Sequence, residues 1–110
     1  MRNSLGEFEQ IVLLAVARLG DEAYGTTIRR EIDRRVGRDV SVGALYATLE
    51  RLETKGLVRT RDGEPTAQRG GRAKRFYALS AAGVRALREA RSVQDRMWEG
   101  LDLGARGKRT

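Results

Sequence analysis

The sequence contains no cysteine and no histidine, and it has a single proline among 110 residues. The absence of both residue types excludes disulfides, thiolate nucleophiles, zinc fingers, histidine-dependent catalytic triads and nearly all transition-metal sites. No cluster of carboxylates or other nucleophiles stands out in the remaining residues. We therefore expect a protein with no metal and no cofactor that is not an enzyme.

Long apolar segments are also lacking. The longest run, residues 11–17, is far shorter than the roughly 20 residues that cross a bilayer. It follows Glu7 and Glu9, whereas an export signal begins with basic residues. We expect a cytoplasmic protein with no membrane partner.

Basic residues outnumber acidic ones by 22 to 15, which gives a formal net charge of +7. Nineteen of them are arginines, whose forked guanidinium groups are suited to binding phosphate. A polyanion is therefore the predicted partner, although an arginine-rich surface can also serve solubility alone. The six aromatic residues are few for a protein that stacks on single-stranded RNA. Leu, Ile, Val and Phe total 25 residues, which predicts one folded domain.

The apolar spacing predicts two helices in the first third of the chain. Residues 4–7 have the spacing of a capping box, and the helix that follows carries apolar residues on several sides up to Gly20. A second helix starts with Gly25 or Thr26 as its cap and ends at Gly37. Its apolar stripe is formed by Ile28, Ile32 and Val36. The arginines on its polar face, which either contact a phosphate backbone or are solvated beside acidic neighbours, are Arg29, Arg30 and Arg34.

Ser41 is the predicted N-cap of a third helix, which ends at residues 55–56. Its inward stripe is formed by Leu45, Leu49 and Leu52. The first two turns present small residues outward, and these are Gly43, Ala44, Ala47 and Thr48. Small side chains allow another surface, such as the floor of a DNA groove, to approach closely.

A β-hairpin is predicted next, with strands at 57–61 and 76–79 and a basic loop at 62–74. Arg72 and Lys74 fall on one face of the strand and Arg75 on the other, because side chains alternate along a strand. We expect Arg72 and Lys74 to contact DNA and Arg69, at the tip, to reach a minor groove, the alternative being that all three are merely solvated.

A last helix begins at Ala81 after the cap Ser80 and is predicted to continue to residue 103. Its apolar seam, which predicts a dimer interface, consists of Ala86, Ala90, Val93, Met97 and Leu101. Trp98 lies beside this seam and either packs in the dimer or lines a pocket for an aromatic effector.

This order of elements predicts a mainly α fold with a two-stranded β-hairpin, namely a winged helix-turn-helix. We expect the DNA-binding domain at 1–80, a C-terminal dimerisation helix at 81–103 and a basic tail at 104–110. In such a fold the third helix enters the major groove of double-stranded DNA and the hairpin follows the backbone or the minor groove.

Residues 43–58 resemble the recognition-helix signature of PadR-type transcriptional regulators. Tyr24-Gly25 resembles the entrance to the second helix in that family, and residues 71–80 resemble its wing. Ala44 and Ala47 replace the usual threonine and proline of the signature, and Ala73 replaces the proline of the wing. The resemblance implies a homodimeric repressor of the compact subgroup that binds an inverted-repeat operator and, in many members, releases it when a small hydrophobic or aromatic effector binds.

The resemblance also implies that Tyr46 faces DNA, the alternative being a ring half-buried beside Leu49. The predicted DNA-binding residues are Ser41, Gly43, Ala44, Tyr46, Ala47, Arg69, Arg72 and Lys74. The main rival hypothesis is a winged-helix module whose basic surface binds an acidic protein.

Overall fold

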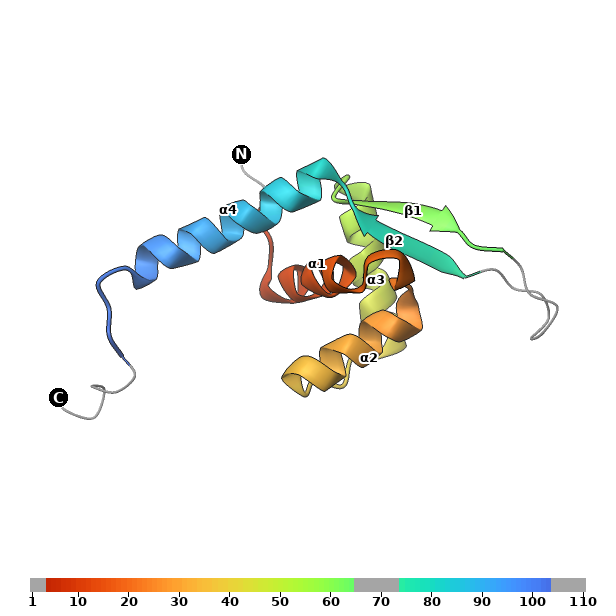
Figure 1. The fold of residues 1–110 in the computed structure, drawn as a ribbon, viewed down its shortest axis with the longest axis horizontal. Helices are drawn as coiled ribbons and strands as arrows, with labels where there is room; N and C mark the ends of the chain where they lie inside the picture. Colours follow the sequence, from red (N-terminus) through yellow and green to blue (C-terminus); the bar gives the residue numbers. More distant parts are fainter. Residues whose placement is uncertain (1–3, 65–73, 104–110) are drawn as a thin grey trace.

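The computed structural model describes residues 4–64 and 74–103. The elements follow in the order α1 (Glu7–Leu19), a 3-10 turn η1 (Gly20–Glu22), α2 (Gly25–Val36), α3 (Val42–Thr54), β1 (Val58–Asp62), β2 (Arg75–Leu79) and α4 (Ala81–Trp98) (Figure 1). Three helices, a hairpin and a last helix confirm the predicted mainly α fold with a two-stranded hairpin.

The core lies where α1 meets α2, α3, β2 and α4. Leu13 and Val12 of α1 are fully buried, and α3 contributes the predicted stripe of three buried leucines. Two apolar side chains predicted to be inside are exposed instead, Leu14 at 50% and Val36 at 57%. Both border a surface groove between α1 and α2 that no further element covers in the described part of the chain.

The starts of α1 and α2 differ from the prediction. Gly6, not Ser4, is the N-cap of α1, because the Glu9 carboxylate reaches back three residues to accept the Gly6 N–H at 2.9 Å. Tyr24 is the N-cap of α2 rather than Gly25 or Thr26, because the Thr27 hydroxyl accepts the Tyr24 N–H at 3.0 Å.

Two serine caps are confirmed. The Ser41 hydroxyl accepts the Ala44 N–H at the start of α3, and the Ser80 hydroxyl accepts the Gly83 N–H at the start of α4, both at 3.0 Å. These bonds satisfy backbone donors that have no partner within the first helical turn.

Gly37 ends α2 as predicted, in the left-handed conformation with φ of 66°. The predicted end of α4 at residue 103 is wrong, since the helix ends at Trp98. Gly100 has a φ of 83°, a conformation that an α-helix does not contain. Leu101 therefore follows the helix and does not extend its apolar seam.

The hairpin pairs β1 and β2 antiparallel, from Val58 opposite Leu79 to Asp62 opposite Arg75. β1 starts and ends one residue later than predicted and β2 starts one residue earlier. The other edge of β2 joins the segment before α2, since the Tyr77 N–H donates to the Ala23 carbonyl at 2.9 Å. The wing is thereby attached to the entrance of α2. Arg69 and Arg72 lie outside the described residues.

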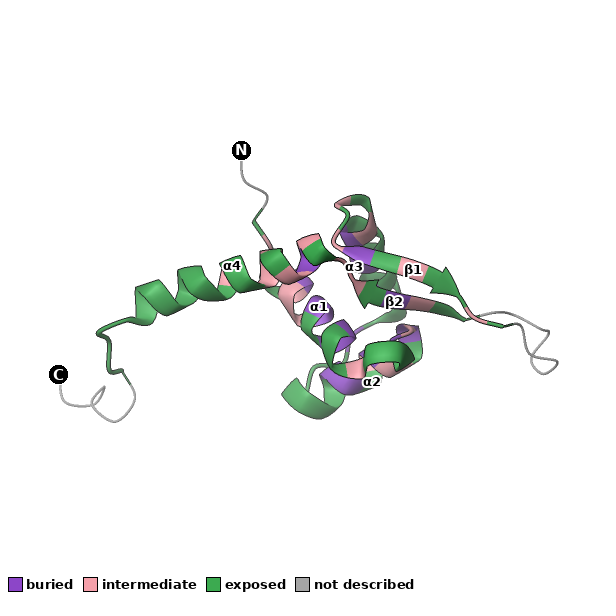
Figure 2. Ribbon diagram, turned by 45° about the horizontal axis from the view of Figure 1, so that its top comes forward, coloured by how far each residue is buried: buried purple, intermediate pink, exposed green. Residues whose placement is uncertain are grey.

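The first two turns of α4 pack on the domain, where Leu87 contacts the core, and the later turns extend away from it (Figure 1). Gly83 is buried against the Leu57 carbonyl, where a Cβ atom would overlap the oxygen. Residues 91–98 are all exposed (Figure 2). Of the helices in the described ranges, none is both long enough and apolar enough to cross a bilayer.

Candidate nucleic-acid interface

The outer face of α3 carries small residues over its first two turns. Ser41, Gly43, Ala44 and Ala47 are exposed, as predicted. Thr48 was predicted to face outward but is buried, with 2% exposure, and its hydroxyl accepts a bond from Arg51 Nη2 at 3.2 Å. The reason is its place on the helix: three and four residues separate it from Leu45 and Leu52, so it belongs to their inward stripe.

Tyr46 lies over the beginning of α2. Its side chain is 45% exposed, and a Cβ atom placed on Gly25 would overlap the tyrosine hydroxyl and approach Cζ to 2.7 Å. The Tyr46 ring, on α3, therefore contacts the backbone at Gly25, where α2 begins. The sequence motif Tyr24-Gly25 is explained in part by this contact, because only glycine leaves room for the ring.

Lys74, at the root of the wing, lies against Tyr24. Its Nζ atom is 4.5 Å from the centroid of the Tyr24 ring and 3.5 Å from the phenol oxygen. Arg75 instead approaches Asp62 of β1, at 3.8 Å between Nε and Oδ1. Consecutive residues thus contact different partners, as alternation along the strand predicts.

Tyr24 also contacts Phe76 of β2. The two ring centroids are 5.4 Å apart with an interplanar angle of 67°, an edge-to-face arrangement, and the Arg61 guanidinium lies 4.3 Å from the Phe76 centroid. The start of α2, the face of α3 and the root of the wing therefore meet at Tyr24 and Gly25. The sequence analysis noted Tyr24 only as part of the resemblance at the entrance to the second helix and did not place it among the DNA-binding residues.

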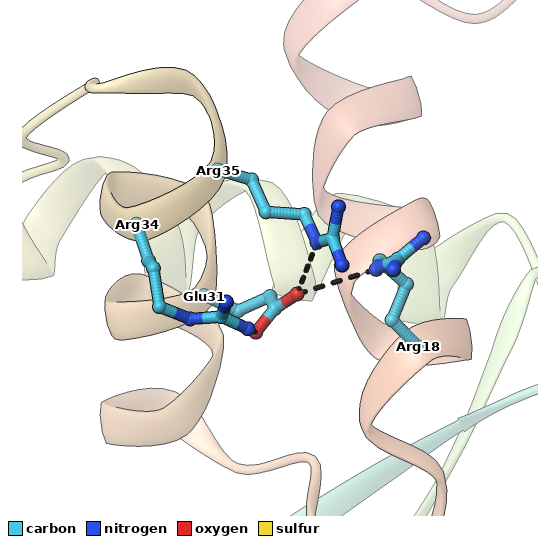
Figure 3. A network of polar contacts seen from close by, with 4 residues as sticks. All are labelled: Arg18, Glu31, Arg34 and Arg35. Atoms are coloured by element: carbon cyan, nitrogen blue, oxygen red, sulfur yellow. Dashed lines mark hydrogen bonds and ion pairs between the residues drawn. The ribbon is translucent and has the colours of Figure 1, made fainter.

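The arginines of α2 are largely engaged within the protein. Glu31, whose side chain is 9% exposed, pairs with Arg34 at 2.6 Å, Arg35 at 2.8 Å and Arg18 of α1 at 3.3 Å (Figure 3). Hydrogen bonds from Arg35 and Arg34 lower the pKa of the Glu31 carboxyl. Elsewhere on the helix, Arg29 Nε donates to the Val40 carbonyl at 2.7 Å, and Arg30 is exposed.

Glu9 connects α1 to the far end of α3. Its carboxylate accepts from Lys55 Nζ at 3.0 Å and lies 3.5 Å from Arg51 Nε, while its other oxygen binds the Gly6 N–H. Burial raises the pKa of Glu9, but the bonds from Gly6, Lys55 and Arg51 together outweigh it, so the net shift is downward. The network fixes the C-terminal end of α3, opposite the end that carries the small residues.

The predicted seam of α4 is partly covered at its start and open at its end. Ala86, Ala90 and Val93 line a groove with Leu5, although Val93 is still 39% exposed, and Met97 is 73% exposed.

Trp98 is 54% exposed. It borders a shallow surface formed mostly by charged residues at the end of α4, namely Arg88, Arg91, Asp95, Arg96 and Glu99. In the described ranges of a single copy, no apolar cavity surrounds this ring. Nor is any group of three or more acidic side chains there placed to hold a metal ion.

Comparison with known proteins identifies relatives of the whole domain. The family model described as the transcriptional regulator PadR-like family matches residues 13–89. The transcriptional regulator Rv3488 of Mycobacterium tuberculosis is 38% identical over 79 residues, which are 70% of this chain and 67% of the relative.

Solved structures share the fold. A PadR-like transcription factor from Bacteroides fragilis is 22% identical with a TM-score of 0.69, and the match covers 84% of each chain. A PadR family regulator from Eggerthella lenta is 23% identical with a TM-score of 0.67, covering 94% of this chain and 88% of the other. The family match, together with the Rv3488 alignment, assigns this chain to the PadR-like family, and it is a DNA-binding transcriptional regulator, not an enzyme.

Proposed function

We propose that the protein is a dimeric repressor that binds an inverted-repeat operator with the start of α3 in the major groove and the wing on the neighbouring backbone. The observation that carries this proposal is the meeting of Tyr46 from α3 and Lys74 from the wing at Tyr24 and Gly25. Two exposed residues that carry hydrogen-bond donors, one from each element, thereby lie beside the start of α3, where Gly43, Ala44 and Ala47 are small.

Each part of this surface has a chemical task. Gly43, Ala44 and Ala47 allow the α3 backbone to approach base edges, while the Tyr46 hydroxyl and the N-terminus of α3 at Ser41 bind phosphate oxygens. Lys74 adds a charged phosphate contact. Arg72 and Arg69, the other predicted DNA contacts of the wing, lie outside the described residues.

Dimerisation places two such surfaces on one duplex. The exposed apolar residues Val93 and Met97 continue the seam begun by Ala86 and Ala90, and a second copy of α4 would cover them. A two-fold axis through this contact sets the two α3 helices about one DNA turn apart, roughly 34 Å. Trp98, beside the seam, would then line a pocket between subunits for a small hydrophobic or aromatic effector that releases the DNA.

Sequencing the genomic fragments that the purified protein retains at about 150 mM salt tests this function, since phosphate binding is strongly salt-dependent in this range. We expect enrichment of an inverted repeat. Combined replacement of Tyr46 and Arg72 by alanine should abolish the enrichment without unfolding the protein, whereas Arg88→Ala, which removes an exposed arginine from α4, should preserve it. Retention without sequence preference would instead favour the module that binds an acidic protein.

The salt dependence of DNA binding is a second test of the same surface. If six to ten phosphates are neutralised, affinity should fall by about a thousandfold or more between 50 and 200 mM salt. A flat response would contradict binding through Lys74 and the wing arginines.

A further inference from the structure

Tyr24 belongs to no predicted DNA contact, yet its ring contacts Lys74 and Phe76 of the wing, and its neighbour Gly25 contacts Tyr46 of α3. We propose that Tyr24 is a positioning residue for DNA binding, which holds the Lys74 ammonium beside Tyr46 so that both donors reach the same stretch of the DNA backbone. This inference rests on the proposed function and adds to it one residue, Tyr24, which acts on DNA binding through Lys74.

Tyr24 is itself rigidly placed. It is the N-cap of α2, it forms a β-bridge with Phe76, and its ring meets the Phe76 ring edge-to-face. The neighbouring backbone bond from Tyr77 to Ala23 fixes the same segment. The ring therefore offers a fixed support, although it lies at the surface.

Lys74 is exposed, and a lysine on a flexible four-carbon stem samples many rotamers when nothing holds it. Here its ammonium lies over the ring of Tyr24, within the distance at which a cation is attracted to an aromatic face. An ammonium group has three N–H donors, so the contact with the phenol oxygen leaves donors for a phosphate. A lysine that is already ordered loses less entropy when DNA binds.

The contact predicts that Tyr24 and Lys74 act together on DNA affinity. Tyr24→Leu should weaken binding of the retained operator duplex by about two- to fivefold when Lys74 is present. In the Lys74→Gln protein the same change should have little further effect. Fluorescence anisotropy measures the duplex affinity of the wild type, the two single variants and the double variant, which completes a double-mutant cycle.

Arg59→Gln is the matched control, because it removes one exposed charge from the same hairpin, on β1. The fold-changes in affinity caused by Arg59→Gln and by Tyr24→Leu should multiply in the double variant, as they do for independent changes. If the effects of Tyr24→Leu and Lys74→Gln also multiply, or if Lys74→Gln leaves affinity unchanged, the proposal is overturned.

Leucine also loses the edge contact with Phe76, so a second variant separates positioning from folding. Tyr24→Phe keeps both ring contacts and loses only the hydroxyl. In NMR spectra of the free protein, the Lys74 ε-methylene protons should be shifted upfield by the ring in the wild type and in Tyr24→Phe, and Tyr24→Phe should bind the duplex within about twofold of the wild type. Random-coil shifts of these protons in the wild type would overturn the proposal, whatever the stability of Tyr24→Leu.

Failure of this inference is distinct from failure of the proposed function. The effects of Tyr24→Leu and Lys74→Gln could prove independent while the protein still selects an inverted repeat and still requires Tyr46. That result would refute only the role of Tyr24. If the wild type selects no operator, the proposed function itself is refuted.

Discussion

The hydroxyl of Tyr46 occupies the space that a Cβ atom on Gly25 would need. Gly25→Ala should therefore displace the ring, and because the half-exposed ring can move outward, the free energy of unfolding should fall by no more than about 1 kcal/mol. Alanine would otherwise favour the helix by about 1 kcal/mol relative to glycine, so a loss of stability identifies the clash as its cause. Urea denaturation measures the change.

The Tyr46→Ala background provides the control for this clash. Without the ring, Gly25→Ala should be neutral or stabilising. An equal loss of stability with and without Tyr46 would show that the two residues do not meet.

Substitution separates the cap that Ser41 provides for α3 from the phosphate binding that we propose for it. Ser41→Ala should lower the free energy of unfolding by about 1 kcal/mol, because the Ala44 N–H loses its partner. Ser41→Asp should keep the cap and the stability, yet weaken DNA binding by repelling phosphate. Ser80→Ala is the matched control, since it removes the cap of α4 and should lower stability without moving the DNA contact. Equal operator affinity for Ser41→Asp and the wild type would show that no phosphate binds at Ser41.

Glu9→Gln should lower the free energy of unfolding by about 1–3 kcal/mol at pH 7, because Lys55 and the Gly6 N–H lose a charged acceptor. The pKa of Glu9 is lower in the folded protein than in the unfolded chain, so its contribution is present above the unfolded value of about 4.3 and is lost as pH falls through the folded value. The stabilities of wild type and variant should converge as the pH falls below the lowered pKa of folded Glu9.

Exposed Glu50, on the same helix as Lys55, is the control for Glu9. Glu50→Gln should change stability little at any pH. A difference between Glu9→Gln and wild type that stays constant from neutral to strongly acidic pH would contradict the role of the Glu9 carboxylate.

Val93→Arg should convert the proposed dimer to a monomer, because a charge would enter the apolar seam of α4 at the proposed two-fold contact. The winged-helix domain should remain folded, since Val93 is 39% exposed and does not belong to the hydrophobic core. Sedimentation velocity and circular dichroism measure both properties. Ser92→Arg introduces the same charge away from the seam and should remain dimeric. A wild-type protein that sediments as a monomer would contradict the proposed interface.

Local signals in the sequence were enough for much of the fold. The caps Ser41 and Ser80 and the stop at Gly37 were predicted because each depends on residues within one turn of the helix. Thr48 was misplaced because its small size was given more weight than its helical spacing. The end of α4 was misplaced because Leu101 continued an apolar pattern past Gly100, whose positive φ ends it.

The contacts that make the candidate interface depend on tertiary structure. Tyr24 and Lys74 are separated by 50 positions, and their contact follows from the attachment of β2 to the entrance of α2. The same holds for Tyr46 over Gly25. Sequence patterns placed Tyr46 and Lys74 in the DNA-binding set, but they did not predict that Lys74 would contact Tyr24 and that Tyr46 would contact the neighbouring Gly25.

NMR titration of the labelled protein with the retained operator duplex tests the central claim most directly. The account predicts that the largest changes in amide shifts fall at residues 41–47 and 74–76, with little change around Glu31 and Arg18. Changes centred on the Glu31 cluster, with residues 41–47 unaffected, would contradict it.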